Sequence, residues 1–399
     1  MKTRTGLTAV TLLALFSTAC DQASAQAEPA SSAAPSAATA VAAAPLPPRP
    51  ATVDISMLYS SEKKEWMEAA AAGFQKAHPE IKLTLTAMGS LDTAKAILDS
   101  KEKPTLFSPA DSLVQNLLAS DWKAVNHADL FAAGGEDAPQ PVVLTPLVFV
   151  AWEDRGAVLQ KAAGGTIGWK TLHAGVSAHE GWPALGGPAA WGFIKLGHAD
   201  PAHSNSGLQA LFSMTFDFYG KPGGIEVGDL LRPKLQTFVR ELEKGVPSLE
   251  GSTSAFMTDM LRFGPSKYDV AVVYESLALA QIGNADGRWG KLRVYYPGTT
   301  IWSDHPVEVL QAPWVSDAQR AAARAFIGHL KSRPVQEMAI TYGFRPADPT
   351  VGLKTADPTN PFTRLADRGV KLDIPPMAPP PGGEVVHTML QMWSRVVAK

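Results

Sequence analysis

Apolar and polar positions alternate along the chain in blocks that predict strands, each followed by a helix. Residues 53–59 are apolar enough for a strand, and residues 81–87 predict a second one after Pro79. The helix expected between them has apolar positions at helical spacing: Trp66, Ala70, Phe74 and Ala77. A strand, a helix and a strand in this order form a β-α-β unit, which builds a mostly parallel sheet.

The same pattern restarts in the second half of the chain. Residues 142–152 form a long apolar run interrupted by Pro146, which we interpret as a crossover strand into a second domain. After Tyr296 the chain is expected to return to the first domain, with a strand at 307–310 and a helix at 316–332 capped by Ser316. A final helix at 384–397 has one apolar face and should dock on the body. Its face could instead bind a partner, but it has too few cations for a membrane-lying helix.

Small polar loops follow the predicted strands and open the predicted helices. Open α/β sheets bind ligands at the carboxyl ends of their strands, where helix N-termini present free N–H groups. Each hydroxyl could also simply cap its own helix, and Ser206 with Gln209 fits a capping box. Gly207 would let a ligand approach the backbone. The candidate ligand-binding residues are Ser60, Ser61, Ser90, Ser108, Ser204, Asn205, Ser206, Gly207, Ser252, Thr253, Tyr274 and Glu275.

The first 51 residues differ in composition from the rest. Lys2 and Arg4 precede an apolar run at 6–16 that is too short to span a bilayer, as in an export leader. The leader ends at Cys20 in a segment that resembles a bacterial lipobox, so Cys20 is the expected lipidation site; an ordinary signal peptide is the alternative. Asp21 would then favour retention at the inner membrane. Residues 20–51 are rich in Ala, Ser and Pro and predict a tether.

Composition limits the functions that the folded part can have. Cys20 is the only cysteine of the 399 residues, so the body has no disulfide and no cysteine nucleophile or metal ligand. With 36 Lys+Arg against 38 Asp+Glu the net charge is -2, which argues against nucleic acid as a partner. At 45% hydrophobic residues, the roughly 350 residues after the leader and tether can bury the cores of two domains.

Two chemical alternatives arise from the sequence. His198, Asp200 and His203 lie within six positions and could hold a transition metal, although no fourth ligand is identifiable. The nucleophile elbow, the zinc-protease helix and the phosphate-binding loop that mark common enzyme classes are all absent from the sequence. We therefore expect no metal, no cofactor and no catalysis, with an exported hydrolase as a remote alternative.

Several segments, in their order along the chain, resemble those of bacterial extracellular solute-binding proteins. The resemblance covers about residues 52–346 and is closest to the molybdate- and sulfate-binding kind, including lipoproteins of unassigned ligand. The segments are Ser108–Ser112, Gly197–Gly207, Gly264–Asp269 with Tyr274–Ser276, Tyr296-Pro297, Trp302–Pro306 and Gly343–Pro346. This likeness implies a type II periplasmic-binding fold, an α/β fold whose two lobes close over a solute. Each lobe would be a mixed, mostly parallel sheet flanked by helices, and crossover strands would join them.

The resemblance also gives roles to the candidate residues. The segment 200–207 would bind an oxyanion through backbone amides and hydroxyls, and the serines at 60, 61, 90 and 108 would face it from the first lobe. Glu275 departs from such an anion site because a carboxylate repels an anion. It could contact a cationic group of the ligand, pair with a lysine across the lobes, or have a structural role.

These observations together predict a membrane-tethered protein that captures a small polar or anionic solute for the permease of an ABC-type transporter. A tethered sensor that performs no transport is the alternative. The expected domains are a signal peptide at 1–19, a tether at 20–51, lobe 1 at 52–145 and 303–399, and lobe 2 at 146–302. We expect a monomer, exported and lipid-anchored to the cell membrane facing the periplasm or exterior.

Overall fold

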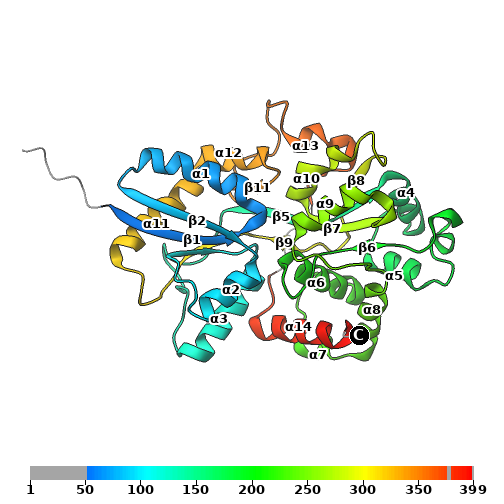
Figure 1. Cartoon of the computed structure of the whole chain (residues 1–399), viewed down its shortest axis with the longest axis horizontal. Helices are drawn as coiled ribbons and strands as arrows, with labels where there is room; N and C mark the ends of the chain where they lie inside the picture. The colour runs from blue at the N-terminus through cyan, green and yellow to red at the C-terminus, as the bar shows by residue number, and fades with distance from the viewer. Residues whose placement is uncertain (1–51, 375–378, 398–399) are drawn as a thin grey trace, which may run out of the picture. The chain divides into compact units, whose positions relative to one another are not determined.

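The computed structural model describes residues 52–374 and 379–397, and the predictions for the leader, Cys20 and the tether lie outside this part. Within it, helices and strands form two sheets flanked by helices (Figure 1). None of the helices described is long and apolar enough to cross a bilayer.

The first sheet has the strand order β2-β1-β3-β10-β4. Its central strand β1 pairs in parallel with both β2 and β3, as the β-α-β pattern predicts. The return strand β10 pairs antiparallel with β3 and β4. The strands are β1 (Val53–Ser60), β2 (Ile81–Met88), β3 (Leu106–Ser108), β4 (Gln140–Pro141) and β10 (Pro306–Val309). The carboxyl ends of β1 and β2 therefore lie side by side.

The second sheet is arranged around β5, the long strand expected at 142–152; its role as a crossover between domains stays a prediction. β5 pairs antiparallel with four strands, β7, β8, β9 and β11, and only β6 and β7 pair in parallel. This sheet is thus less parallel than expected, because the chain enters it along β5 and returns in the opposite direction. The strands are β5 (Val143–Trp152), β6 (Leu196–Gly197), β7 (Val270–Tyr274), β8 (Leu292–Tyr295), β9 (Trp302–Ser303) and β11 (Arg345–Pro346).

Helices cover both sheets with apolar faces. In α1, residues Trp66, Ala70 and Phe74 are buried at helical spacing, whereas Ala77 is exposed in the last turn. The helices associated with the first sheet are α1 (Lys64–Ala77), α2 (Ser90–Leu98), α3 (Ser112–Asn126), α11 (Asp317–Leu330) and α12 (Arg333–Thr341). The capping box at Ser316 and Gln319 confirms the predicted start of α11.

The helices around the second sheet are more numerous and shorter. They are α4 (Glu153–Ala162), α5 (Trp169–Ser177), α6 (Asn205–Tyr219), α7 (Val227–Leu230), α8 (Pro233–Glu243), α9 (Thr253–Phe263), α10 (Glu275–Gln281) and α13 (Pro361–Arg364). Of these, α6, α9 and α10 begin at the polar loops singled out in the sequence. Their N-termini are thus placed near the ends of β5 and β7.

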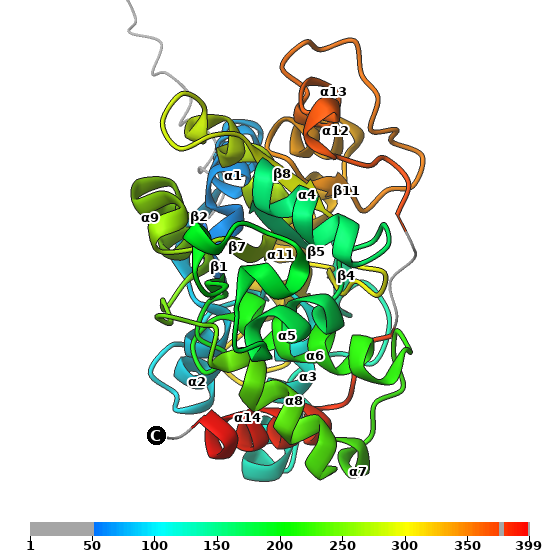
Figure 2. The same cartoon turned by 90° about the vertical axis from the view of Figure 1, so that its right-hand side faces the viewer.

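The final helix α14 (Gly383–Val397) docks on the body, as its apolar face predicts. Val386, Met389 and Trp393 are buried, and the helix contacts α3 as well as α6, α7 and α8 (Figure 2). α3 belongs to the first sheet and the other three helices to the second. The segment that we assigned to lobe 1 therefore contacts elements of both sheets, and the lobe boundaries themselves stay a prediction.

Candidate functional site

A small polar pocket, with a cavity volume of about 20 Å³, lies between the elements of the two sheets. Its lining comes from the end of β1, the start of α2, the starts of α6 and α9, and the end of β7. The residues are Ser61, Glu62, Gly89, Ser90, His203, Ser204, Asn205, Gly251, Ser252, Thr253, Ser254 and Tyr274. Strand ends and helix starts converge here, as the general rule for ligand sites in open sheets requires.

Most of the candidate ligand-binding residues line this pocket. They are Ser61, Ser90, Ser204, Asn205, Ser252, Thr253 and Tyr274. Ser60 lies beside it at the end of β1, and its hydroxyl is buried without a hydrogen-bond partner. A buried hydroxyl is rarely left without a partner in a folded protein, so Ser60 is available to a bound molecule.

Three hydroxyls form a cluster on the side of the second sheet. Thr253 Oγ1 lies 2.6 Å from Ser206 Oγ and 3.4 Å from Ser204 Oγ, and the two serine oxygens are 3.2 Å apart. Ser206 is buried beneath the pocket and supports the other two. Ser252 caps α9 by accepting a hydrogen bond from the Ala255 amide at 3.2 Å, as predicted.

The capping box proposed for Ser206 and Gln209 is wrong. The residue before α6 is Ser204, its side chain makes no capping bond, and Ser206 lies inside the first turn. Gln209 instead donates from Nε2 to the Asp111 carboxylate and, at 3.1 Å, to Ser303 Oγ. Tertiary contact with a partner 98 residues away outweighs the local motif.

Asn205 and Tyr274 are joined across the floor of the pocket. Asn205 Nδ2 donates to Tyr274 Oη at 3.0 Å, while Asn205 Oδ1 is buried without a partner. Burial raises the pKa of Tyr274 well above its ordinary value, and the charges of Glu62 and Asp111 raise it further. Tyr274 therefore stays a neutral hydroxyl at any physiological pH.

Two candidate residues, Ser108 and Gly207, contact other parts of the protein and do not line the pocket. Ser108 is fully buried and donates to the Pro306 carbonyl at 2.7 Å, which joins β3 to β10. A Cβ atom at Gly207 would lie 2.2 Å from the Ala199 carbonyl oxygen and 2.8 Å from Pro201 N. The close approach that requires glycine at 207 is thus made by the chain's own loop.

Sequence reasoning missed Glu62, the acidic residue in the lining of the pocket. Its side chain is 9% exposed, and Oε1 has no hydrogen-bond partner. In the sequence it resembles an ordinary acid in the first turn of a helix. Its place directly after Ser60 and Ser61, at the end of β1, was the available signal.

A buried polar cluster lies behind the pocket, composed of Lys63, Asp111, Asp304, His305 and Glu308. Burial lowers the pKa of Lys63 to about 8, although the carboxylates around it oppose this change. Burial, together with the charge of Asp304, raises the pKa of Asp111 to about 7. Burial also raises the pKa of Glu308 well above its ordinary value. Burial thus favours the uncharged forms of Lys63, Asp111 and Glu308.

Comparison with known proteins identifies the kind of protein that has this arrangement. The family model described as "Bacterial extracellular solute-binding protein" matches residues 55–345. The chain belongs to this family. No curated protein sequence matches it.

Solved structures of binding proteins share the fold. A periplasmic thiamin binding protein has a TM-score of 0.59 at 15% identity, with 89% of this chain and 100% of that chain covered. The fructose-6-phosphate-bound AfuA from Actinobacillus pleuropneumoniae has a TM-score of 0.56 at 14% identity, with 86% and 98% covered. The sulfate-binding protein SubI from Mycobacterium tuberculosis H37Rv has a TM-score of 0.52 at 17% identity, with 81% and 92% covered. The predicted two-lobed type II periplasmic-binding fold is thereby confirmed, and the chain is a solute-binding protein, not an enzyme.

Glu275 of this solute-binding protein is engaged by the protein itself. Its carboxylate accepts hydrogen bonds from Arg345 Nε at 2.7 Å and Nη2 at 2.8 Å, and a third from Tyr296 Oη. Burial and the Glu275 charge raise the pKa of Tyr296, which keeps that hydroxyl protonated as a donor. Glu275 does not line the polar pocket.

The residues considered for a metal site have separate partners. His198 is buried with Nε2 3.3 Å from Glu243 Oε1, and Asp200 accepts from the Ala202 amide at 2.8 Å. His203 is exposed at the pocket mouth, 3.7 Å from Asp92. No group of three or more His, Cys, Asp or Glu side chains suited to a metal ion occurs among the described residues.

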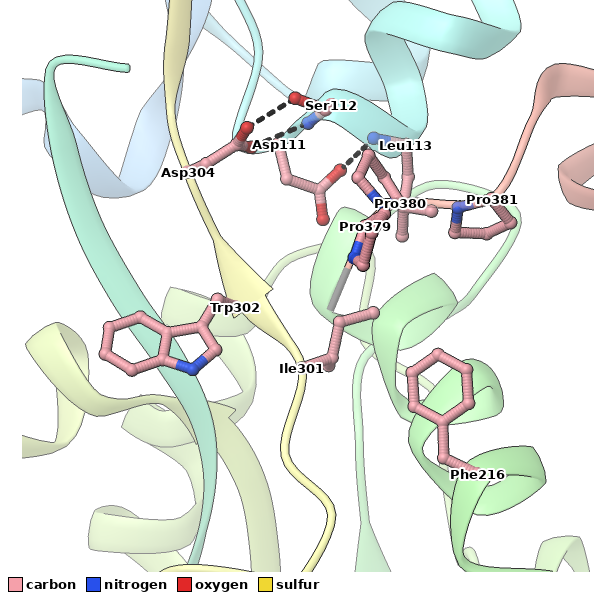
Figure 3. A pocket seen from close by; sticks show the side chains of 10 residues that line it. All are labelled: Asp111, Ser112, Leu113, Phe216, Ile301, Trp302, Asp304, Pro379, Pro380 and Pro381. Carbon is pink, nitrogen blue, oxygen red and sulfur yellow. Dashed lines mark hydrogen bonds between the residues drawn. The ribbon is translucent and has the colours of Figure 1, made fainter. Parts of the chain in front are cut away.

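A second pocket between the sheets has a different character (Figure 3). Residues Pro379–Pro381 cover it, and Phe216 and Ile301 form an apolar wall. Its carboxylates are occupied, since Asp304 accepts from the Ser112 amide at 2.8 Å and Asp111 from the Leu113 amide at 2.8 Å. Its carboxylates thus have partners within the protein, unlike Glu62 Oε1 in the polar pocket.

Proposed function

We propose that this solute-binding protein is anchored to the cell membrane through a lipid on Cys20 and delivers a small polar solute to the permease of an ABC-type transporter. The solute binds in the pocket between the two lobes. The lobes close over it by a hinge motion, as in two-domain binding proteins generally. Because the bound solute contacts both lobes, its binding stabilises the closed form relative to the open one.

The observation that carries this proposal is a set of unpartnered polar atoms in and directly beside one pocket lined by elements of both sheets. Ser60 Oγ and Glu62 Oε1 come from the first sheet, and Asn205 Oδ1 comes from the second. Buried polar atoms are normally hydrogen-bonded, and an unsatisfied one costs about 1–3 kcal/mol. A polar molecule bridging the lobes would satisfy all three.

Solute binding is tested by thermal unfolding of the full-length chain in mild detergent, with a panel of oxyanions, amino acids, organic acids, organic cations and sugars. A ligand of the folded state at about 100 times its Kd stabilises by about 2.7 kcal/mol and raises Tm. Thr253→Val removes one hydroxyl from the cluster and should weaken binding about tenfold. Thr258→Val is the matched control on α9, because its hydroxyl bonds only to the Ser254 carbonyl.

Delivery to a permease is tested by uptake of the radiolabelled hit in cells with and without this chain. A transporter receptor is required for uptake at low solute concentration, whereas a sensor is not. A panel without any stabilising compound would contradict solute binding, and normal uptake of the hit by cells that lack this chain would contradict delivery to a permease.

The anchor is tested separately by Cys20→Ser. We expect the wild-type chain in the membrane fraction and the variant in the soluble fraction, because no described helix can hold it in a bilayer. Mass spectrometry of the N-terminal peptide should show a lipid on Cys20. An unmodified N-terminus beyond residue 20 would instead indicate an ordinary signal peptide.

A further inference from the structure

The charge of the solute can be inferred from the hydrogen-bond partners of Glu62. Glu62 Oε1 lies 3.4 Å from His305 Nδ1, a nitrogen that could donate a hydrogen bond to it. Whether His305 can donate depends on Lys63, whose Nζ lies 3.4 Å from the same nitrogen.

Lys63 uses all of its donors on buried acceptors. Its ammonium group has three N–H bonds. Two point to the carbonyl oxygens of Ser108 and Pro109, at 2.9 and 2.8 Å, and the third to His305 Nδ1. His305 Nδ1 is therefore an acceptor without a proton. Burial and the Lys63 charge lower the pKa of His305 well below its ordinary value, in agreement with a neutral ring.

Glu62 Oε1 is consequently left without a hydrogen-bond donor among the described residues. A neutral imidazole that accepts at Nδ1 presents a lone pair to the carboxylate. Asn205 lies on the opposite side of the pocket and also lacks a donor, because its unpartnered atom is the acceptor Oδ1. Both groups require hydrogen-bond donors, and one of them is a carboxylate.

No lysine or arginine is among the residues that line this pocket. Lys64 lines an adjoining pocket that shares Ser61, Glu62 and Ser254 with the first, but its side chain is 57% exposed and lies 3.8 Å from Glu68. The adjoining pocket also has an apolar side, formed by Leu277 and Phe344. The nearby Lys63 ammonium is outside the lining and donates to Ser108, Pro109 and His305, so an oxyanion would meet the Glu62 carboxylate here without a cation to bind it.

We propose that the solute is an organic cation whose ammonium, amidinium or guanidinium N–H groups bind Glu62 and Asn205. Its less polar remainder extends past Glu62 towards Leu277 and Phe344. This proposal rests on the proposed function and narrows it from a polar solute to a cationic one. A metal ion would need more ligands of its own than this pocket offers.

Isothermal titration of the full-length chain with three sets of probes tests the proposal. The cations are agmatine, arginine, putrescine and tyramine; the anions are sulfate, molybdate and phosphate; the neutral probe is glucose. Choline adds a cation without N–H groups. We expect binding by at least one N–H cation, weaker binding of choline and none of the anions.

The variant Glu62→Gln should weaken binding of that cation roughly 10- to 100-fold, because a charge-assisted hydrogen bond is lost. Glu68→Gln is the matched control, an exposed acid in α1, the helix that follows Glu62, and should leave binding unchanged. Binding of an anion or glucose without any cation would overturn this inference and leave the proposed function intact. If no probe of the broad solute panel binds, both fail. The wild-type titrations decide the question even if Glu62→Gln does not fold.

Discussion

Glu275 on α10 and Arg345 on β11 form a bidentate ion pair, with N···O distances of 2.7 and 2.8 Å, although 70 residues separate them in the chain. The Glu275 side chain is fully buried and that of Arg345 is 7% exposed. Arg345 also donates to the carbonyls of Lys371 and Leu372 at 2.5 and 2.6 Å. The pair thus joins the second sheet to the chain segment that leads towards α14.

Glu275→Gln should destabilise the protein by about 3–5 kcal/mol, because removing one partner of a buried pair leaves the other charge uncompensated. Solute affinity should not change, since Glu275 lies outside the lining of the polar pocket. Urea unfolding and titration of the same preparation measure the two effects. Glu153→Gln breaks the exposed pair with Arg293 and should cost less than about 1 kcal/mol. Loss of binding at unchanged stability would show that Glu275 contacts the solute.

Gly207→Ala should weaken both stability and solute binding. The added methyl group would lie 2.2 Å from the Ala199 carbonyl oxygen, so the loop before α6 has to move, at a cost of about 1–3 kcal/mol. The same loop carries Ser204 into the pocket.

Gly228→Ala is the control, because Gly228 lies in α7 and a methyl group added there would meet no atom within 4 Å outside the adjacent backbone. Alanine there should be neutral or stabilise by up to about 1 kcal/mol. Thermal unfolding and titration compare the two variants. Equal effects would mean that the clash at Gly207 is relieved without moving the loop.

The fold was largely predictable because its signals are local. The apolar runs of β1, β2 and β5 and the caps at Ser252 and Ser316 can each be recognised within a few residues. That the serine-rich loops meet at one site could be predicted from a single rule, because parallel strands place their carboxyl ends at the same edge of a sheet. The antiparallel pairings of β5 could not be predicted, because they depend on which distant strands return to it.

The chemistry of the site was less predictable because it depends on partners that are far apart in sequence. Glu275 is neutralised by Arg345, and Gln209 is held by Asp111. Glu62 becomes important only because Lys63, its neighbour, points away to Ser108, Pro109 and His305. Sequence identifies such side chains as candidates, but their free hydrogen-bonding atoms emerge from tertiary structure.

Asp111 should make stability depend on pH. Burial and the charge of Asp304 raise its pKa from 3.8 to about 7, so the folded state holds a proton that the unfolded state releases. The contribution of this group is fully present below about pH 4 and is lost as pH rises towards 7. At 1.36 kcal/mol per pKa unit the loss is at most about 4 kcal/mol.

Asp111→Asn removes this titration while keeping an acceptor for the Leu113 amide. Relative to the wild type, the variant should gain stability steadily between pH 4 and 7 and then stay constant. Urea unfolding at four pH values in this range provides the measurement. A difference between the two proteins that does not vary with pH would show that Asp111 does not bind a proton in the folded state.

Trp393 on α14 should couple the final helix to the loop that leads into the solute pocket. Its Nε1 donates at 2.8 Å to Glu243 Oε1, which lies 3.3 Å from His198 Nε2, and His198 Nδ1 is 2.8 Å from the Ala199 carbonyl oxygen. Burial opposes protonation of His198, but the charge and hydrogen bond of Glu243, the Ala199 carbonyl and the Asp200 charge together raise the pKa of His198. Trp393→Phe keeps most of the apolar contact and removes the hydrogen bond to this carboxylate, which should cost about 1.5–3 kcal/mol.

Hydrogen exchange of Trp393→Phe should therefore increase in α14 and also in residues 198–204, because Glu243 loses one of the groups that fix it against His198. His387→Gln is the control on the same helix, since its contact with Asp121 on α3 is partly exposed and should contribute less than about 1 kcal/mol. The control is expected to change exchange only near α3. Faster exchange in α14 of Trp393→Phe, with unchanged exchange in residues 198–204, would show that the helix docks independently of the pocket. The contact through Glu243 would then stabilise the body without affecting solute capture.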